Sequence, residues 1–190
     1  TEPMSIAVHA VESIGNVKAG DHVLVQGPGI IGFFVGIACL SRGAKVIMSG
    51  LKKDYASRLA HAEKFGMETL LAEELIQLKD KVDIIFECSG SINAVKAGLN
   101  VLKKGGKAVF VAMYNREVNL FLSTAVRNEW SFLTSYASTP KDYIRSFSIL
   151  DEFSDRIQNL ISTYALTEVT KAFDDAINQK VLKPILRCKD

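Results

Sequence analysis

Short apolar runs of strand length alternate with longer segments of helical period along most of this chain, and this alternation restricts the fold more than any other feature. The strand candidates are residues 22–27, 44–49, 68–71, 82–88, 107–111 and 130–135, and the helix candidates are residues 30–41, 55–65, 92–102 and 140–152. Such alternation is typical of βαβ units around a buried parallel sheet. The sequence therefore predicts an α/β fold, a doubly wound parallel sheet with helices on both faces.

The length of 190 residues suits one domain with its own core, so we expect residues 1–190 to form a single domain. The N-terminal Thr1-Glu2-Pro3 has the residue types of a helix start. Near the C-terminus, an amphipathic helix over 167–179 precedes a strand candidate over 182–188. Because the chain opens on a helix start without an initiator Met, we expect it to be part of a longer protein.

The charges are balanced and scattered, with 23 Lys and Arg against 21 Asp and Glu, a net charge of +2. A basic face for nucleic acid and a polybasic patch for a membrane are both absent from this pattern. The longest apolar stretch, residues 30–40, is too short to span a bilayer, and the N-terminus does not have the pattern of a signal peptide. We therefore expect no nucleic-acid or membrane partner and a cytoplasmic location.

Metal-ligand spacing is also missing from the sequence. The cysteines and histidines are isolated from one another, without a C-x-x-C, H-x-x-x-H or H-E-x-x-H pattern: Cys39, Cys88, Cys188, His9, His22 and His61. Neither a disulfide framework nor a Cys- or His-based zinc site follows from this spacing. We expect buried, reduced thiols.

The stretch HVLVQGPGIIG, residues 22–32, joins a strand candidate to a helix candidate through the spacing G-x-G-x-x-G. In such a turn Gly27 allows the tight bend, Gly29 lets the backbone approach a pyrophosphate, and Gly32 lets the helix pack closely on the sheet. Ile30 and Ile31 open the helix, whose free N–H groups favour an anion. Although glycines also serve purely structural turns, this context favours a Rossmann-type nucleotide site.

A ligand of such a sheet lies across the carboxyl ends of the strands. Three further loops are expected at this edge, and they contain Cys88, Ser89 and Gly90, then Val111, Ala112 and Met113, and finally Ser135 and Tyr136. We therefore include these loops in the predicted cofactor site.

The second strand ends in Ser49-Gly50, where a protein that binds NAD normally carries an acid for the adenosine ribose. A carboxylate would repel a 2′-phosphate, whereas a glycine makes room, and Lys52, Lys53 and Arg58 follow with positive charge. This pattern favours NADP over NAD. The alternative is that Asp54 reaches the ribose of NAD and that the two lysines form a solvated loop.

Together, six segments resemble the medium-chain, zinc-dependent dehydrogenases, especially the polyol branch that includes sorbitol and threonine dehydrogenases. They cover nearly the whole chain and read TEPMSIAVHAV, VKAGDHVLVQGPGIIG, RLAHAEKFG, VDIIFECSG, VLKKGGKAVFVAM and LTEVTKAFDDAINQKVLKPILRC. The resemblance departs from the family pattern in two places: the glycine loop reads GPGIIG, and Gly50 replaces the usual acid.

The resemblance implies a two-domain subunit in which a preceding catalytic domain carries the zinc ligands and this chain carries the cofactor. Residues 1–18 and about 157–190 would be flanking segments that pack on that domain. Glu2 matches a position where polyol-type members place an acid beside the zinc, and Lys183 matches a basic position near the diphosphate. Zinc is expected in the full-length parent and not in this chain, which should bind cofactor without turnover because a catalytic zinc ordinarily needs three protein ligands.

The implied reaction is oxidation of a secondary alcohol or polyol to a ketone, with hydride transfer to NAD(P). The alternatives are a zinc-free quinone or enoyl reductase of the same superfamily, a non-catalytic NAD(P)-sensing domain, and a methyltransferase. Residues 130–135 lie near the edge of the expected sheet, where such enzymes often pair, so a homodimer is expected.

Overall fold

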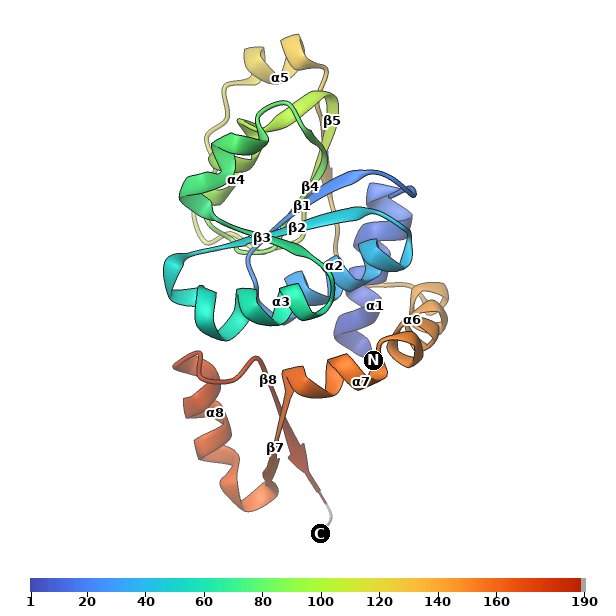
Figure 1. Cartoon of the computed structure of the whole chain (residues 1–190), viewed down its shortest axis with the longest axis vertical. Coiled ribbons are helices and arrows are strands. Elements are labelled where there is room, and N and C mark those ends of the chain that lie inside the picture. The colour runs from blue at the N-terminus through green and yellow to red at the C-terminus, as the bar shows by residue number, and fades with distance from the viewer. Residues whose placement is uncertain (189–190) are drawn as a thin grey trace.

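The computed structural model describes residues 1–188 and contains one six-stranded parallel sheet of order β3-β2-β1-β4-β5-β6 (Figure 1). The strands are β1 His22–Gln26, β2 Lys45–Gly50, β3 Glu68–Leu71, β4 Val82–Glu87, β5 Leu102–Phe110 and β6 Ser131–Thr134. The predicted α/β doubly wound sheet is confirmed. The strand order reverses between β1 and β4, so a crevice opens there at the carboxyl ends of the strands.

Helices cover both faces of this sheet. They are α1 Glu2–Val8, α2 Ile30–Ser41, α3 Ala60–Lys64, α4 Ile92–Leu99, α5 Leu122–Asn128, α6 Pro140–Glu152, α7 Ser154–Ile157 and α8 Val169–Ile177. Further helical segments are π-helical at His9–Gly15 and Tyr55–Leu59 and 3-10 at Lys52–Asp54, Ala72–Leu78, Gln158–Leu160 and Leu166–Glu168. The helices before Gly43 and Gly66 end on left-handed glycines, with φ of 77° and 88°.

Two apolar clusters form the core because neighbouring strand residues point to opposite faces. Val25 belongs to the larger cluster, beneath α1, α2 and α6, whereas Leu24 belongs to the smaller one, beneath α4 and residues 72–78. Helix α2 is buried along most of its length, as its almost wholly apolar sequence requires. The sheet is therefore held between two layers, and its carboxyl edge stays open for a ligand.

Helix α1 is more deeply buried than its modest apolar pattern suggests. Met4, Ala7 and Val8 are at most 1% exposed and pack in the larger cluster, where α1 contacts both α2 and α6. Residues 1–18 thus have partners within this chain, and their packing on a further domain stays a prediction.

A small second unit lies beside the large sheet, at the lower end of Figure 1. It consists of the parallel pair β7 Ile161–Ala165 and β8 Lys183–Arg187, connected through α8. The sequence predicts α8 and β8, whereas β7 has no counterpart among the expected strands.

Strand β5 begins earlier than the sequence predicts. Leu102 already pairs with Val82, and an irregular register between Val82 and Ile84 lets the strand continue through Gly105, whose φ is 74°. The expected helix over 92–102 therefore ends at Leu99. The physical reason is the irregular pairing of β4 with β5, which accommodates Gly105 and Gly106 inside the strand.

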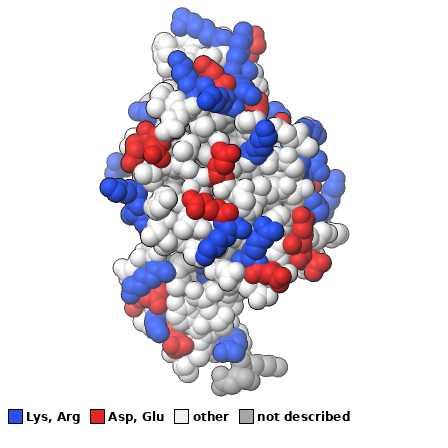
Figure 2. Space-filling model, in the orientation of Figure 1, with Lys and Arg blue, Asp and Glu red and all other residues white. Residues whose placement is uncertain are grey.

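The surface agrees with the scattered charges of the sequence. Figure 2 shows basic and acidic side chains interspersed over the visible face. Among the helices of residues 1–188, none has the length and apolar character needed to cross a bilayer.

Candidate functional site

The glycine loop after β1 has a geometry that only glycine permits at two positions. Gly27 has a φ of 99°, and a Cβ there would lie 2.8 Å from the Cβ of Ser89. A Cβ on Gly32 would collide with the carbonyl oxygen of Gly27. The loop is fixed to the next strand because the Gly27 N–H donates to the Ser49 carbonyl oxygen at 3.0 Å. These contacts hold helix α2 close against the end of β1.

Gly29 is different, because the space beside it is open. It caps α2 in an extended conformation, and no atom of the described chain lies within 4 Å of the position of an added Cβ. Within residues 1–188 no side chain caps this helix, so its first N–H groups are available to a ligand. An anion such as a diphosphate fits this position, because the helix dipole favours negative charge there.

A cavity of about 670 Å³ opens beside this loop, a size within the usual range for small-molecule sites. Seven of the residues predicted from the sequence line it, namely Gly27, Gly29, Ser49, Gly50, Lys53, Cys88 and Ser89. Arg58 and Asp54 line it as well. The structure thus brings the glycine loop, the end of β2 and the loop after β4 together around one cavity.

The other predicted residues lie outside the lining of this cavity: Ile30, Ile31, Gly32, Lys52, Gly90, Val111, Ala112, Met113 and Ser135. The first three form the opening turn of α2, and Lys52 is exposed. The loops after β4 and β5 nevertheless meet, because a Cβ on Gly90 would lie 3.0 Å from the Met113 carbonyl oxygen. Ser135 follows β6, and its buried Oγ has no hydrogen-bond partner in the described chain.

Burial raises the pKa of the Cys88 thiol, and the charge of Glu87 raises it further. Because the thiolate is the nucleophilic form, Cys88 is suited to line the cavity and not to attack a substrate.

The segment after β2 holds three of the four charged side chains of the cavity, Lys53, Asp54 and Arg58, and the fourth, Glu73, follows β3. The Asp54 carboxylate is only 7% exposed, and its Oδ2 accepts a hydrogen bond from the Leu51 N–H at 2.9 Å. The Lys53 ammonium donates to Oε1 of Gln179 at 3.2 Å. Gln179 also lines the cavity, so the C-terminal unit contributes to it. Asp54 is thus engaged with the backbone, whereas Lys53 and Arg58 bring positive charge.

Several lining residues were missed by the sequence analysis. They are Gln26, Pro28, Leu51, Ala72, Glu73, Ser91, Asn93, Ala94, Ala97 and Gln179. Gln26 directly precedes the glycine motif and Pro28 lies within it, so both could have been found from their position after β1. The rest come from segments whose approach to the cavity depends on the tertiary fold.

Glu87, another missed residue, joins the two loops that follow β4 and β5. Its side chain is 1% exposed and accepts hydrogen bonds from the backbone N–H groups of Ser89 at 2.8 Å and Gly90 at 3.1 Å. The hydroxyls of Ser89 and Tyr114 also donate to it. Burial and the hydrogen bond to this carboxylate raise the pKa of Tyr114, so the phenol stays protonated and remains a donor.

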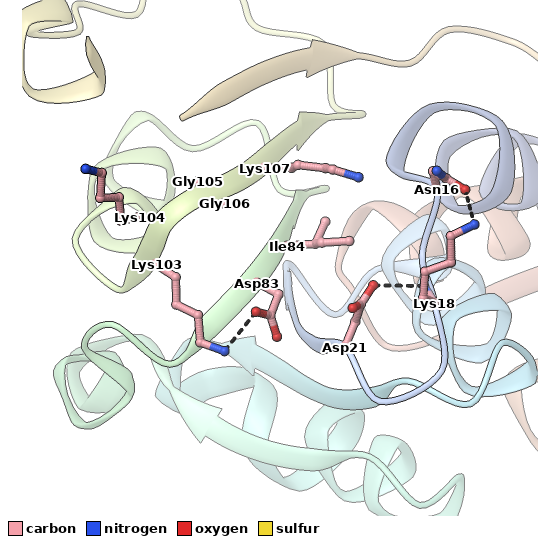
Figure 3. Close-up of a pocket in the computed structure, with 10 residues that line it drawn as sticks. All are labelled: Asn16, Lys18, Asp21, Asp83, Ile84, Lys103, Lys104, Gly105, Gly106 and Lys107. Carbon is pink, nitrogen blue, oxygen red and sulfur yellow. Dashed lines mark hydrogen bonds and ion pairs between the residues drawn. The ribbon is translucent and has the colours of Figure 1, made fainter. Parts of the chain in front are cut away.

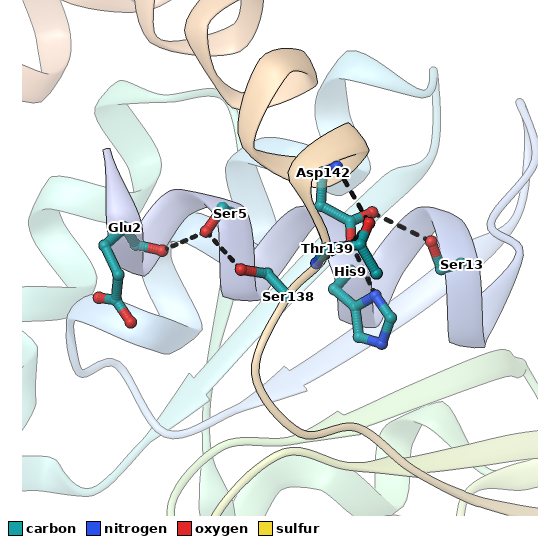
Figure 4. A network of polar contacts seen from close by, with 7 residues as sticks. All are labelled: Glu2, Ser5, His9, Ser13, Ser138, Thr139 and Asp142. Atoms are coloured by element: carbon teal, nitrogen blue, oxygen red, sulfur yellow. Dashed lines mark hydrogen bonds and ion pairs between the residues drawn. The ribbon is translucent and has the colours of Figure 1, made fainter.

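Glu2, the one predicted metal position, is exposed in the first turn of α1 (Figure 4). In residues 1–188 no group of three or more His, Cys, Asp and Glu residues is placed to hold a metal ion. Glu2 therefore does not fit a zinc site with the other described residues of this chain.

A second cavity of about 240 Å³ lies near the opposite, amino ends of β4 and β5 (Figure 3). Lysines dominate its lining, but each already has an acceptor: Lys103 binds Asp83, Lys18 binds Asn16, Lys107 binds the Gly15 carbonyl, and Lys104 faces Glu129 at 3.8 Å. This cavity is remote from the glycine loop, so the carboxyl-end cavity is the candidate site.

Comparison with known proteins agrees with this geometry. Residues 31–152 match the family described as zinc-binding dehydrogenase, so the chain belongs to that family and the resemblance seen in the sequence is confirmed. Among curated relatives, D-arabitol-phosphate dehydrogenase of Enterococcus avium is 29% identical over 98% of this chain and 56% of its own length. Sorbitol dehydrogenase of Halalkalibacterium halodurans is 28% identical over 98% of this chain and 57% of its own length.

Solved structures show the same fold. An alcohol dehydrogenase from Thermotoga maritima superposes with a TM-score of 0.89 at 25% identity, over 97% of this chain and 55% of its own. The 2R,3R-butanediol dehydrogenase from Bacillus subtilis has a TM-score of 0.87 at 22% identity, over 99% and 56% of the two chains. The chain thus spans about half the length of the relatives it matches.

Proposed function

We propose that this chain is the cofactor-binding part of an NAD(P)-dependent dehydrogenase that oxidises a secondary alcohol or polyol to a ketone. The observation that carries the proposal is the cavity of about 670 Å³ beside the glycine loop and the uncapped N-terminus of α2, at the point where the strand order reverses. Membership of the zinc-binding dehydrogenase family and the polyol dehydrogenases among the relatives support the reaction class.

In this proposal the diphosphate lies against Gly29 and the N–H groups of Ile30, Ile31 and Gly32. The nicotinamide would extend toward the loops after β4, β5 and β6, which contain Gly90, Val111, Ala112, Met113 and Ser135. The bound cofactor supplies the hydride acceptor, and the residues of this chain orient it. The adenosine would occupy the cavity between the ends of β2 and β4, which Ser49 and Ser89 line from either side.

The catalytic zinc of the proposed enzyme belongs to the part of the parent protein beyond this chain. Glu2 would approach that zinc from α1, and residues 1–18 and about 157–190 would contact the same part. Alone, this chain would bind cofactor without turnover, because it supplies at most one family-type ligand position. A cytoplasmic location belongs to the proposal and rests on the sequence.

We further propose a preference for NADP. Gly50 ends β2 without a carboxylate, while Lys53 and Arg58 line the cavity. Asp54, the alternative ribose ligand, is already hydrogen-bonded to the Leu51 N–H. A 2′-phosphate would therefore meet the cations Lys53 and Arg58. Hydrogen bonds between such cations and a phosphate are stronger than hydrogen bonds between neutral groups.

Calorimetric titration with NADP(H) and NAD(H) side by side tests both proposals. We expect tighter binding of the phosphorylated form, and a loss of about tenfold in its affinity in Lys53→Ala and in Arg58→Ala. The matched control is Lys52→Ala, which removes the same charge from an exposed neighbour outside the cavity lining. A preference for NAD would refute the NADP assignment, and binding of neither cofactor would refute the proposed site.

A homodimer through β6 is also proposed. This strand forms one edge of the sheet, and Phe121, Leu122 and Val126, in or beside α5 in the segment that precedes it, are 75%, 62% and 75% exposed. Unpaired strand edges and exposed apolar groups favour association. Light scattering after size exclusion should give twice the chain mass of 20.8 kDa, and a monodisperse monomer would contradict this assignment.

A further inference from the structure

The two departures from the family pattern, in the glycine loop and at the end of β2, touch one another in the structure. A Cβ on Gly50 would lie 2.9 Å from Cγ and 3.2 Å from Cδ of Pro28. The φ of Gly50 is outside the left-handed range, so its backbone conformation would accept other residues. Gly50 is therefore required by the space that the proline ring occupies.

The surroundings of this contact leave little room for adjustment. Pro28 is buried, and its ring is rigid, unlike the end of a long side chain. Gly27, directly before it, is hydrogen-bonded to the Ser49 carbonyl, directly before Gly50. On the other side the Cβ of Asp54 would lie 3.3 Å from an added Cβ, and the Asp54 carboxylate is held by the Leu51 N–H. A side chain at position 50 would be overpacked from two sides.

We propose that Pro28 is a specificity-determining residue for the cofactor. Its ring occupies the space that an acidic side chain on residue 50 would need, and so keeps a carboxylate from the position at the end of β2 where a protein that binds NAD normally carries one. Lys53 and Arg58 are then the cations that can meet a 2′-phosphorylated adenosine ribose. Of the two carboxylates in the same lining, Asp54 is held by the Leu51 N–H and Glu73 follows β3. This inference rests on the proposed function and deepens it, because selectivity is controlled from the glycine loop as well as from the end of β2.

Unfolding of four chains without ligand tests the contact: wild type, Gly50→Ala, Pro28→Ala and the double variant. We expect Gly50→Ala to lower the Tm by about 5 °C or more, and the double variant to recover most of that loss relative to Pro28→Ala. Pro28→Ala also changes the flexibility of the unfolded chain, and the four-way comparison subtracts that effect. Additive Tm shifts, or an unchanged Tm for Gly50→Ala, would overturn the proposed role of Pro28.

Cofactor titrations of Gly50→Asp and of Pro28→Ala/Gly50→Asp test selectivity. The single variant should bind both cofactors poorly or fail to fold. The double variant should fold. Relative to the wild type, its affinity for NAD should rise about tenfold and its affinity for NADP should fall about tenfold. Equal cofactor preference in both variants would overturn the inference. Binding of neither cofactor by the wild type would instead overturn the proposed function, and the ligand-free unfolding cycle would still report on the contact between Pro28 and Gly50.

Discussion

Replacement of Asp142 by Ala should destabilise the chain strongly, because this carboxylate joins α6 to the π-helical segment His9–Gly15 that continues α1. Asp142 is 3% exposed in the first turn of α6, and its two oxygens receive hydrogen bonds from four donors (Figure 4). The Thr139 N–H and hydroxyl lie at 2.8 and 2.7 Å, Nδ1 of His9 at 2.8 Å, and the Ser13 hydroxyl at 3.1 Å. One side chain thus caps α6 and fixes it to the N-terminal helix.

The magnitude follows from these contacts. A hydrogen bond to a charged group contributes about 1.5–3 kcal/mol, and loss of a helix cap typically costs about 1 kcal/mol. Because the four bonds share one carboxylate and are not additive, we expect Asp142→Ala to lower the free energy of unfolding by about 3–5 kcal/mol at pH 7. Asp151→Ala is the matched control: this exposed aspartate lies near the end of the same helix and should change stability by at most about 0.5 kcal/mol.

Urea unfolding followed by circular dichroism, at pH 7 and near pH 3, measures this effect. Burial raises the pKa of Asp142, but the hydrogen bonds from Thr139, His9 and Ser13 outweigh it and hold the pKa below its ordinary value. A depressed folded-state pKa contributes stability above the unfolded pKa of about 3.9, and this stability is lost as the pH falls through the folded value. The difference between wild type and Asp142→Ala should therefore shrink in acid. A cost below about 1 kcal/mol at pH 7, or one that grows in acid, would refute the reasoning.

Three further outcomes are expected. Gly29→Ala should keep the wild-type Tm and lose cofactor affinity in calorimetry, because its added methyl enters open space on the path of the diphosphate. Gly32→Ala should lower the Tm measured by calorimetric scanning, because its methyl collides with the backbone; an equal Tm for the two variants would contradict this distinction. A colorimetric thiol reagent should modify exposed Cys188 quickly and the other two cysteines slowly, because burial raises the pKa of Cys39 and Cys88; a second fast thiol would contradict this.

The sequence predicts the central sheet well and the periphery less well, for a physical reason. Buried strands such as β1 and β4 must be apolar on both faces, so they are visible as continuous apolar runs. In strand β7, Ser162 and Thr163 interrupt the apolar pattern, because this strand pairs with β8 at the margin of the fold. Helix α5 spans only seven residues, all outside the core, and its exposed Leu122 and Val126 make a pattern too short to identify a helix.

The candidate site was also only partly predictable from the sequence, for the same reason. The glycine spacing gives the loop at the start of α2, because Gly27 and Gly32 each answer a local steric requirement. The contact of Lys53 with Gln179 joins residues 126 positions apart, and local sequence cannot show which of two adjacent lysines faces the cavity. Glu87 appears in the sequence as one residue of an apolar strand, and its role depends on loops that fold back over it. The collision between Pro28 and Gly50 likewise appears only in three dimensions.

The burial of helix α1 also has a consequence for the order of events during folding. Met4, Ala7 and Val8 are covered by α2 on one side and α6 on the other, and the bond between His9 and Asp142 spans 133 positions of the chain. During synthesis the α2 side can close early, but the α6 side stays uncovered until residue 152 has left the ribosome. The last layer over α1 is therefore a late, long-range closure, and a chain released before α6 would expose an apolar strip prone to aggregation.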